Sequence, residues 1–263
     1  MKNLPQGFIG VLPIINLKNF LRIAPMKYRY LAVLAASACI NLAPLKVDAQ
    51  ANTVNIMPFG DSITSFGAAP ESSYRYWLYV DLTNAHFNNF HFVGSQSGAS
   101  DGTPANSWPE ENYEGGGDDW TTATALSDVG NVVSQSPDII LYEFGDNDYQ
   151  QWDPSTSRTN IDQTIEGIRA SLPNTLIILA IPTHWAAPFD PQARKYMSQI
   201  DTAVHQAYMD EKKAGANVVQ VNLASGFSPS GDTLGDGVHP NVKGEKMIAK
   251  KFFNALRPRL KKM

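Results

Sequence analysis

Five short apolar runs alternate with longer mixed segments along residues 54–256. The apolar runs lie at 54–60, 90–94, 137–145, 175–183 and 217–224. Runs of this length and composition predict short buried strands. Segments of helical character separate and follow them, at 73–85, 120–134, 159–172, 190–215 and 241–256.

The alternation of strands and helices predicts an α/β fold. Strands that are apolar throughout are buried on both faces, as in a parallel sheet with helices on both sides. Residues 50–263 contain no composition break, internal repeat or linker, and we interpret them as one domain. We therefore expect a three-layer α/β domain built on a five-stranded parallel sheet.

The first 49 residues have a different pattern. From Met26, a basic start leads into an apolar stretch at 31–45 and the small-residue pattern Val-Asp-Ala at 47–49. This is the layout of a secretory signal peptide. A membrane anchor is the alternative, but the stretch is shorter than the ~20 residues of a spanning helix. We expect translation to start at Met26, cleavage after Ala49, and a secreted product without stable membrane association.

Removal of residues 1–49 changes the cysteine content and the charge. Cys39 is the only cysteine, so the mature chain would have no disulfide; a lipid-modified Cys39 is an alternative that Ala36 disfavours. Of 21 basic and 25 acidic residues, six and one are removed, which leaves 15 and 24 and a formal charge of −9. Such a surface argues against nucleic acid or an anionic membrane as a partner and favours a neutral substrate.

Candidate catalytic residues follow three of the predicted strands. Ser62 follows the first in "MPFGDSITSFG", Asn147 the third in "GDND", and Asp236 and His239 the fifth in "GDGVHPN". Open parallel sheets bind ligands outside the carboxyl ends of their strands, where we expect these residues to meet. An Asp three residues before a His can accept a hydrogen bond from one imidazole nitrogen. The other nitrogen can then take a proton from a serine hydroxyl.

Each motif also has a simpler interpretation. The "DGVHPN" segment could be a turn into a helix that Asn241 caps, and "FGDND" could be an Asx-turn. Asn147 could instead direct its amide at an oxyanion, together with backbone N–H groups of Ser62 and a glycine. A calcium loop is disfavoured because Gln150 replaces a ligand and no glycine follows. Because no metal-ligand spacing is present, we expect no metal.

Ser100 in "GASDG" also matches the pattern G-x-S-x-G. That motif needs a strand before the serine and a helix directly after it. Here a loop rich in Pro and Asn follows, so we interpret Ser100 as a loop serine.

In this order, "GDSI", "GDND" and "DGVHPN" resemble the motifs of the SGNH (GDSL-type) hydrolases, and the matches span residues 57–241. The resemblance implies a flavodoxin-like three-layer fold and ester hydrolysis without a metal or organic cofactor. It also implies that Ser62 is the nucleophile, His239 the base and Asp236 its orienting group. Ser62, Asn147 and a glycine would stabilise the oxyanion.

The second block of the superfamily is altered in this chain. Secreted carbohydrate esterases typically have "DFVGS" and then "EG..GW", whereas this chain has "FHFVGS" and "YEGGGDDWTT". Asp118 and Asp119 are inserted between the glycines and Trp120. We assign the oxyanion donor to Gly117, with Gly115 and Gly116 as alternatives. The other motifs look most like those of acetyl esterases that act on xylan.

Aromatic and polar residues near the same edge suit a sugar substrate. We expect the substrate to contact Asp61, Trp120, Asp148, His184 and Trp185. The leading hypothesis is a secreted serine esterase that removes short acyl groups, above all acetyl, from carbohydrate such as acetylated xylan. A lysophospholipase or arylesterase is the alternative within the fold, and a non-catalytic carbohydrate-binding protein is the alternative outside the enzymes.

Overall fold

The computed structural model describes residues 53–66, 73–98, 112–117, 119–150, 153–185 and 191–262. The chain divides into two compact units, Met1–Gln50 and Ala51–Met263, and the described residues belong to the second. The expected signal segment, Cys39 and Ser100 lie outside the described residues. Within the described ranges, every helix is too short or too polar to cross a membrane.

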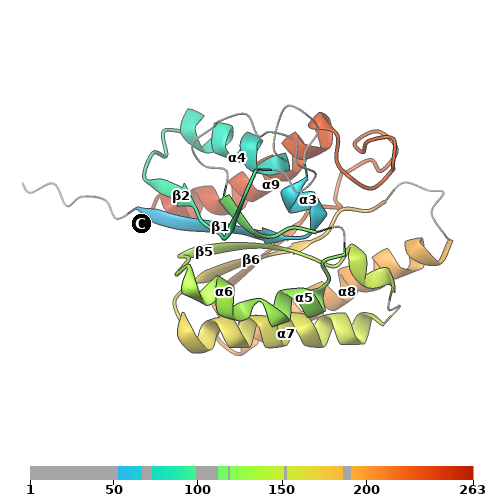
Figure 1. The fold of residues 1–263 in the computed structure, drawn as a ribbon, viewed down its shortest axis with the longest axis horizontal. Coiled ribbons are helices and arrows are strands. Elements are labelled where there is room, and N and C mark those ends of the chain that lie inside the picture. The colour runs from blue at the N-terminus through green and yellow to red at the C-terminus, as the bar shows by residue number, and fades with distance from the viewer. Residues whose placement is uncertain are drawn as a thin grey trace, which may run out of the picture. The chain divides into compact units, whose positions relative to one another are not determined.

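A mostly parallel sheet forms the middle layer of the second unit (Figure 1). Its parallel core has the order β2-β1-β5-β6-β7, with bounds Phe90–Phe92, Val54–Gly60, Ile139–Glu143, Leu176–Ile181 and Val218–Asn222. Numbered along the chain this is the order 2-1-3-4-5, which is typical of flavodoxin-like folds. The predicted α/β fold is confirmed, and each predicted strand lies where the apolar runs placed it.

Two strands were not predicted. Strand β4 (Asn112–Gly115) pairs in parallel with β1 beyond the end of β2, and β3 (Gln96–Ser97) pairs with β4 in antiparallel orientation. They complete a seven-stranded sheet. Both are very short, and β4 ends in glycine, so neither gives a periodic apolar signal. Strand β4 matters for the site because it leads the glycine-rich segment 115–117 to the carboxyl end of β1.

Helices cover both faces of the sheet (Figure 1). One layer contains α4 (Ser73–Asn84) and α9 (Val242–Leu260), which contact each other. The other contains α5 (Thr122–Ser127), α6 (Val129–Ser134), α7 (Pro154–Ser171) and α8 (Pro191–Lys213). The single helix predicted at 120–134 is therefore interrupted at Asp128.

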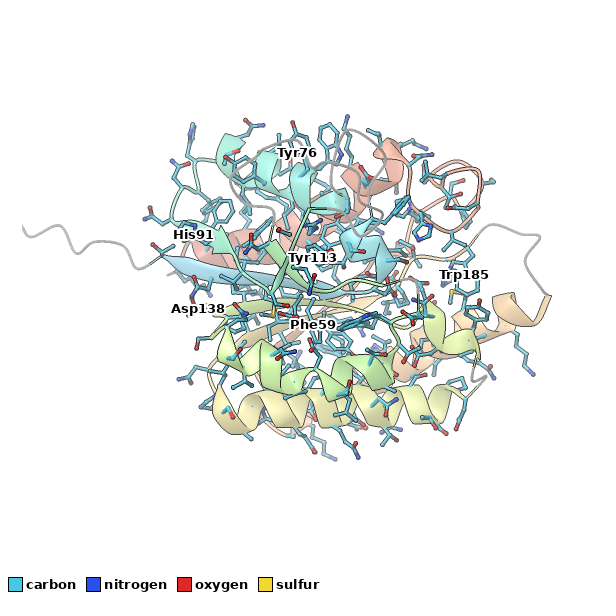
Figure 2. The ribbon with its side chains drawn as sticks, viewed as in Figure 1. Phe59, Tyr76, His91, Tyr113, Asp138 and Trp185 are labelled. Atoms are coloured by element: carbon cyan, nitrogen blue, oxygen red, sulfur yellow. The ribbon has the colours of Figure 1, made fainter. Side chains whose placement is uncertain are left out.

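Side chains of β1 alternate between two apolar cores, as the period of a strand requires. Met57 and Phe59 lie in the core toward α7 and α8, and Figure 2 shows Phe59 beneath the sheet on that side. Val54 and Ile56 lie in the core toward α4 and α9. Because both faces of β1 are buried, its carboxyl end is held in a fixed position relative to the helices on either side.

Candidate active site

Ser62 lies at a sharp turn from β1 into the one-turn helix α3 (Ser62–Ser65). Asp61 caps this helix, because its carboxylate accepts a 3.0 Å hydrogen bond from the N–H of Ile63. A Cβ atom at Gly60 would lie 2.0 Å from Thr64 Oγ1, so only glycine permits the turn to be this tight. The turn places Ser62 at the first helical position, directly outside the strand end.

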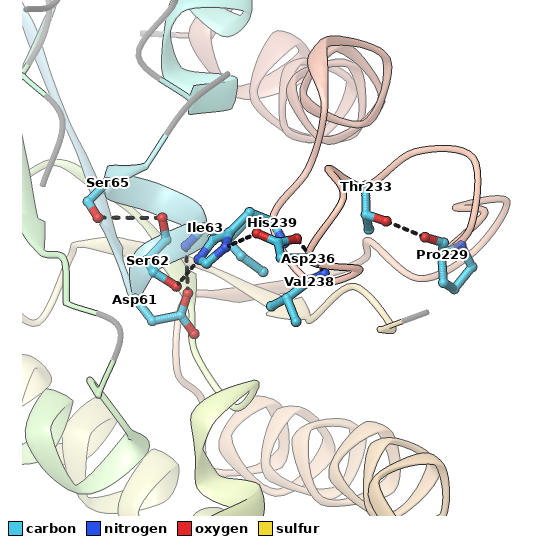
Figure 3. Close-up of polar contacts among 9 residues, drawn as sticks. All are labelled: Asp61, Ser62, Ile63, Ser65, Pro229, Thr233, Asp236, Val238 and His239. Atoms are coloured by element: carbon cyan, nitrogen blue, oxygen red, sulfur yellow. Dashed lines mark hydrogen bonds and ion pairs between the residues drawn. The ribbon is translucent and has the colours of Figure 1, made fainter. Parts of the chain in front are cut away.

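The structure brings Ser62, His239 and Asp236 together in one chain of hydrogen bonds (Figure 3). Ser62 Oγ lies 3.0 Å from His239 Nε2. On the other side of the ring, His239 Nδ1 lies 2.8 Å from Asp236 Oδ2. These are the contacts that the spacing of the two motifs predicted. The arrangement can move the hydroxyl proton of Ser62 to the imidazole.

The turn that carries Asp236 and His239 orients the carboxylate through its own backbone. Asp236 Oδ1 accepts hydrogen bonds from the N–H groups of Val238 at 2.9 Å and His239 at 3.1 Å. Burial acts to raise the pKa of Asp236, but these bonds and the imidazole outweigh it and hold the pKa below its usual range. Asp236 is therefore ionised near neutral pH, as a group that orients an imidazole must be.

Two neighbouring elements fix the position of His239. The ring of Phe66, at the end of α3, lies against the imidazole with 4.7 Å between ring centroids. Beyond the turn, Asn241 caps α9 by accepting hydrogen bonds from the N–H groups of Lys243 and Gly244. Asn241 thus has the capping role considered for it, and the cap coexists with the triad geometry.

The candidate oxyanion donors are the N–H of Ser62, an N–H of the segment 115–117 and the amide of Asn147. The N–H groups of Asp61 and of residues 63–66 donate to acceptors within the described residues, whereas Ser62 is at the first helical position, where an N–H has no intrahelical acceptor. The N–H of Gly116 donates to Gly60 O at 2.9 Å, and Gly115 is paired with Gly60 inside the sheet. Gly117, which follows the strand, stays the predicted donor.

Asn147 begins the 3₁₀ helix η1 (Asn147–Gln150) after β5. One N–H of its amide donates to the carbonyl of Trp120 at 2.9 Å, which ties η1 to the end of the glycine-rich segment. A primary amide has a second N–H, which can serve an oxyanion. The predicted role of Asn147 as an oxyanion donor therefore requires only the second N–H of its amide, which does not bind the carbonyl of Trp120.

The structure gives two of the expected substrate contacts structural roles instead. Asp61 is fully buried and caps α3. Asp148 is 1% exposed and accepts hydrogen bonds from the N–H of Thr122 at 2.9 Å and the hydroxyl of Ser157 at 3.0 Å. Both carboxylates follow strand ends, as the sequence indicated, but they point into the protein, where a sugar cannot reach them.

The three expected aromatic contacts differ in their surroundings. Trp185 is 7% exposed and packs edge-on against Tyr149, so its face is not open to a sugar ring; Figure 2 shows it near α8. Trp120 is half-buried and stacks over Phe144. The side chain of His184 is 36% exposed and its Nε2 lies 3.0 Å from Asp201. Trp120 and His184 therefore remain candidates for substrate contact, whereas Trp185 belongs to the core.

A group of buried acids lies beside the nucleophile turn, and no sequence motif indicated it. Asp61, Glu143 and Asp146 each place a carboxyl oxygen within 4.8 Å of the others. Burial, followed by the charge of nearby Asp61, raises the pKa of both Glu143 and Asp146 well above the usual range. Three carboxylates this close in the interior cannot all be ionised without compensation. The raised pKa values favour the protonated forms of Glu143 and Asp146.

Comparisons with known proteins identify the motifs as those of a hydrolase family. The family model described as GDSL-like Lipase/Acylhydrolase matches residues 56–252. A curated relative, a multidomain esterase of Ruminococcus flavefaciens, is 25% identical over 268 residues, a match that covers 94% of this chain and 33% of the relative. The chain thus spans about a third of the length of that relative.

Solved structures of carbohydrate esterases resemble the second unit. A family 3 carbohydrate esterase of Clostridium thermocellum is 28% identical, with a TM-score of 0.68, over 80% of this chain and 98% of that one. A family 3 carbohydrate esterase from Talaromyces cellulolyticus is 23% identical, with a TM-score of 0.67, over 80% of this chain and 100% of that one. At the lower identity the likeness is evidence for the fold alone.

Proposed function

The chain belongs to the family of GDSL-like lipases and acylhydrolases, and we propose that it is a serine esterase that removes acetyl groups from carbohydrate, such as acetylated xylan. Membership makes residues 56–252 an SGNH-type esterase or acylhydrolase domain. The observation that carries the finer proposal is the hydrogen-bonded chain from Ser62 through His239 to Asp236.

In the first half of the reaction, Ser62 Oγ attacks the carbonyl carbon of the acyl group while its proton passes to His239 Nε2. The Asp236 carboxylate holds the proton on Nδ1, which leaves Nε2 free to accept, and it stabilises the imidazolium that forms. The carbonyl oxygen becomes an oxyanion that accepts hydrogen bonds from Ser62 N–H, Gly117 N–H and the amide of Asn147. The intermediate collapses, the C–O bond to the sugar breaks, and the sugar hydroxyl leaves with the proton from Nε2.

In the second half, water replaces the sugar. His239 Nε2 takes a proton from the water, whose oxygen attacks the acyl carbon of the ester on Ser62. Collapse of this second intermediate breaks the bond to Ser62 Oγ, which recovers a proton from the imidazole. Acetate is released, and the enzyme returns to its starting protonation state.

The substrate class is inferred from relatives and from the composition of the site. The structurally similar proteins include family 3 carbohydrate esterases, and the matched curated relative is an esterase. Trp120 and His184, which follow strands β4 and β6, stay the expected contacts to the sugar. We also propose export, based on the signal-like segment 26–49, and N-terminal sequencing of the protein from culture medium tests it by the expected start at Gln50.

Substitution of Ser62 tests the proposed function. Ser62→Ala should lower kcat for p-nitrophenyl acetate by about 10⁴-fold or more, because the nucleophile is lost while the oxyanion donors remain. Ser100→Ala is the matched control and should keep the parental rate. The parent should also release acetate from acetylated xylan faster than it hydrolyses a lysophospholipid. Hydrolysis by Ser62→Ala at close to the parental rate would disprove the assignment.

A further inference from the structure

The buried carboxyl of Glu143 lies against the nucleophile helix α3. Glu143 ends β5 and is fully buried. Its Oε2 accepts a 3.2 Å hydrogen bond from the hydroxyl of Thr64, in α3. A carboxyl oxygen of Glu143 also lies within 4.8 Å of one of Asp61, the cap of that helix. Glu143 is therefore close to the nucleophile turn at two points, one on either side of Ser62.

The hydroxyl groups beside Glu143 form a chain of hydrogen bonds in which each hydroxyl donates to the next group. The hydroxyl of Thr64 also lies 3.1 Å from the hydroxyl of Tyr74, in α4. Because Thr64 has one proton and gives it to Glu143, the proton in the contact with Tyr74 must come from Tyr74. Two buried carboxyl groups as close as those of Glu143 and Asp61 favour one proton between them, and Asp61 already accepts from Ile63 N–H. A protonated Glu143 that donates to Asp61 completes the chain.

The alternative assignment of the proton fits less well. If Asp61 held it, the ionised group would be Glu143, which is fully buried and faces Asp61, Asp146 and, through Thr64, Tyr74. An ionised Asp61, by contrast, receives a backbone N–H at the start of a helix, where negative charge is stabilised. The electrostatics thus place the charge on Asp61 and the proton on Glu143.

We propose that Glu143 is a positioning residue that stays protonated in the active enzyme and donates a hydrogen bond to Asp61. This hydrogen bond holds α3 in place and so keeps the Ser62 hydroxyl within hydrogen-bond distance of His239. This role rests on the proposed esterase function. Asp61 accepts one hydrogen bond from the N–H of Ile63 in α3 and another from the protonated carboxyl group of Glu143, so it connects β5 to the nucleophile turn. Without the donor, the negative charge of Asp61 would stay buried beside the nucleophile turn with less compensation.

Paired substitutions separate positioning from simple packing. Glu143→Gln keeps a donor for Asp61 and an acceptor for Thr64, whereas Glu143→Leu keeps the volume and removes both. With p-nitrophenyl acetate, we expect Glu143→Leu to lower kcat by about ten- to a hundredfold with little change in KM, and Glu143→Gln to restore most of that loss. Glu211, a buried glutamate paired with Arg169, supplies the control pair. Glu211→Gln and Glu211→Leu should lower Tm and leave kcat unchanged.

Infrared difference spectroscopy reads the protonation state without relying on activity. The parent minus Glu143→Gln spectrum at neutral pH should show the C=O stretch of a protonated carboxyl group, so the test does not depend on how well Glu143→Leu folds. An active parent without this band, or with a stoichiometric metal that Glu143→Gln loses, would overturn the positioning role and leave the proposed function intact. A parent that shows the band but hydrolyses no ester would overturn the proposed function.

Discussion

Replacement of Asp146 by asparagine removes one carboxyl group from the buried trio behind Ser62. Asp146 is 2% exposed, and burial together with the charges of Asp61 and Asp201 raises its pKa well above the usual range. The carboxyl group of Glu143, which is buried and also has a raised pKa, lies within 4.8 Å of it. The native state therefore keeps a proton on Asp146 at pH values where the unfolded chain has lost it.

The sign of the effect on stability follows from this difference. An unfolded aspartate releases its proton near pH ~3.9. Above that pH, and up to the raised native pKa, the free energy of unfolding of the parent falls by about 1.4 kcal/mol per pH unit for this proton. Asp146→Asn has no such proton to lose. Between about pH 4.5 and 6.5 the variant should therefore gain stability relative to the parent over every part of the range in which native Asp146 keeps its proton.

Urea unfolding of both proteins, followed by tryptophan fluorescence at several fixed pH values, measures the difference. For a domain of this size, each kcal/mol gained corresponds to a rise of roughly 2–4 °C in Tm. Asp153→Asn is the matched control, because Asp153 is exposed and hydrogen bonds from Ser155 and Thr156 lower its pKa to about 2. Its difference from the parent should be constant over this pH range. A constant difference for Asp146→Asn as well would mean that Asp146 is ionised in the native state and would refute the reasoning.

The other predictions concern the triad and the turn beneath it. Asp236→Asn should lower kcat by up to about 10⁴-fold, the loss seen for this change in the serine-protease triad, and His239→Ala by at least as much, as measured by release of p-nitrophenol. The hydrogen bonds that lower the pKa of Asp236 should stabilise the fold above about pH 4, and this contribution should fade as the pH falls further, which acid unfolding of Asp236→Asn and parent can compare. Gly60→Ala should lower Tm because its Cβ would meet Thr64 Oγ1 at 2.0 Å, and unaltered thermal unfolding would contradict the geometry of the turn. Dialysis against EDTA should leave ester hydrolysis unchanged, and activity that is lost and then restored by a divalent cation would contradict a metal-free mechanism.

The sheet was predictable because its central strands β1, β5 and β6 are almost entirely apolar and buried. Burial on both faces removes the polar alternation of a surface strand, and the runs from β1 to β7 stand out against the mixed helical segments. Strands β3 and β4 carry no such signal. Their pairing with β1 depends on Gly60 and Gly115 coming together in space, which no local pattern encodes.

The candidate triad was predictable for a different reason. Asp236 and His239 are close in sequence, so the turn alone brings their side chains together, and the topology of a parallel sheet brings that turn to Ser62. Phe66, which packs on the imidazole, was missed because its contact depends on the end of α3. The roles of Asp61 and Asp148 were misjudged because sequence places a residue at a strand end without showing which way its side chain points.

Glu143 was missed because its function depends on its surroundings and not on its neighbours in sequence. In "IILYEFG" it lies inside the run predicted as a strand at 137–145, and nothing in that run shows that its buried carboxyl group lies against the nucleophile turn.

The site thus uses two carboxyl groups in opposite states. Asp236 has a side chain 43% exposed and a lowered pKa, and it orients His239 only when ionised. Glu143 is buried with a raised pKa, and it supports Asp61 only when protonated. Hydrolysis is therefore expected only at pH values above the first pKa and below the second. Because Glu143→Gln cannot ionise, it should extend activity on the alkaline side while leaving the acid limb in place. An alkaline limb that is identical in parent and variant would show that Glu143 does not set the upper limit.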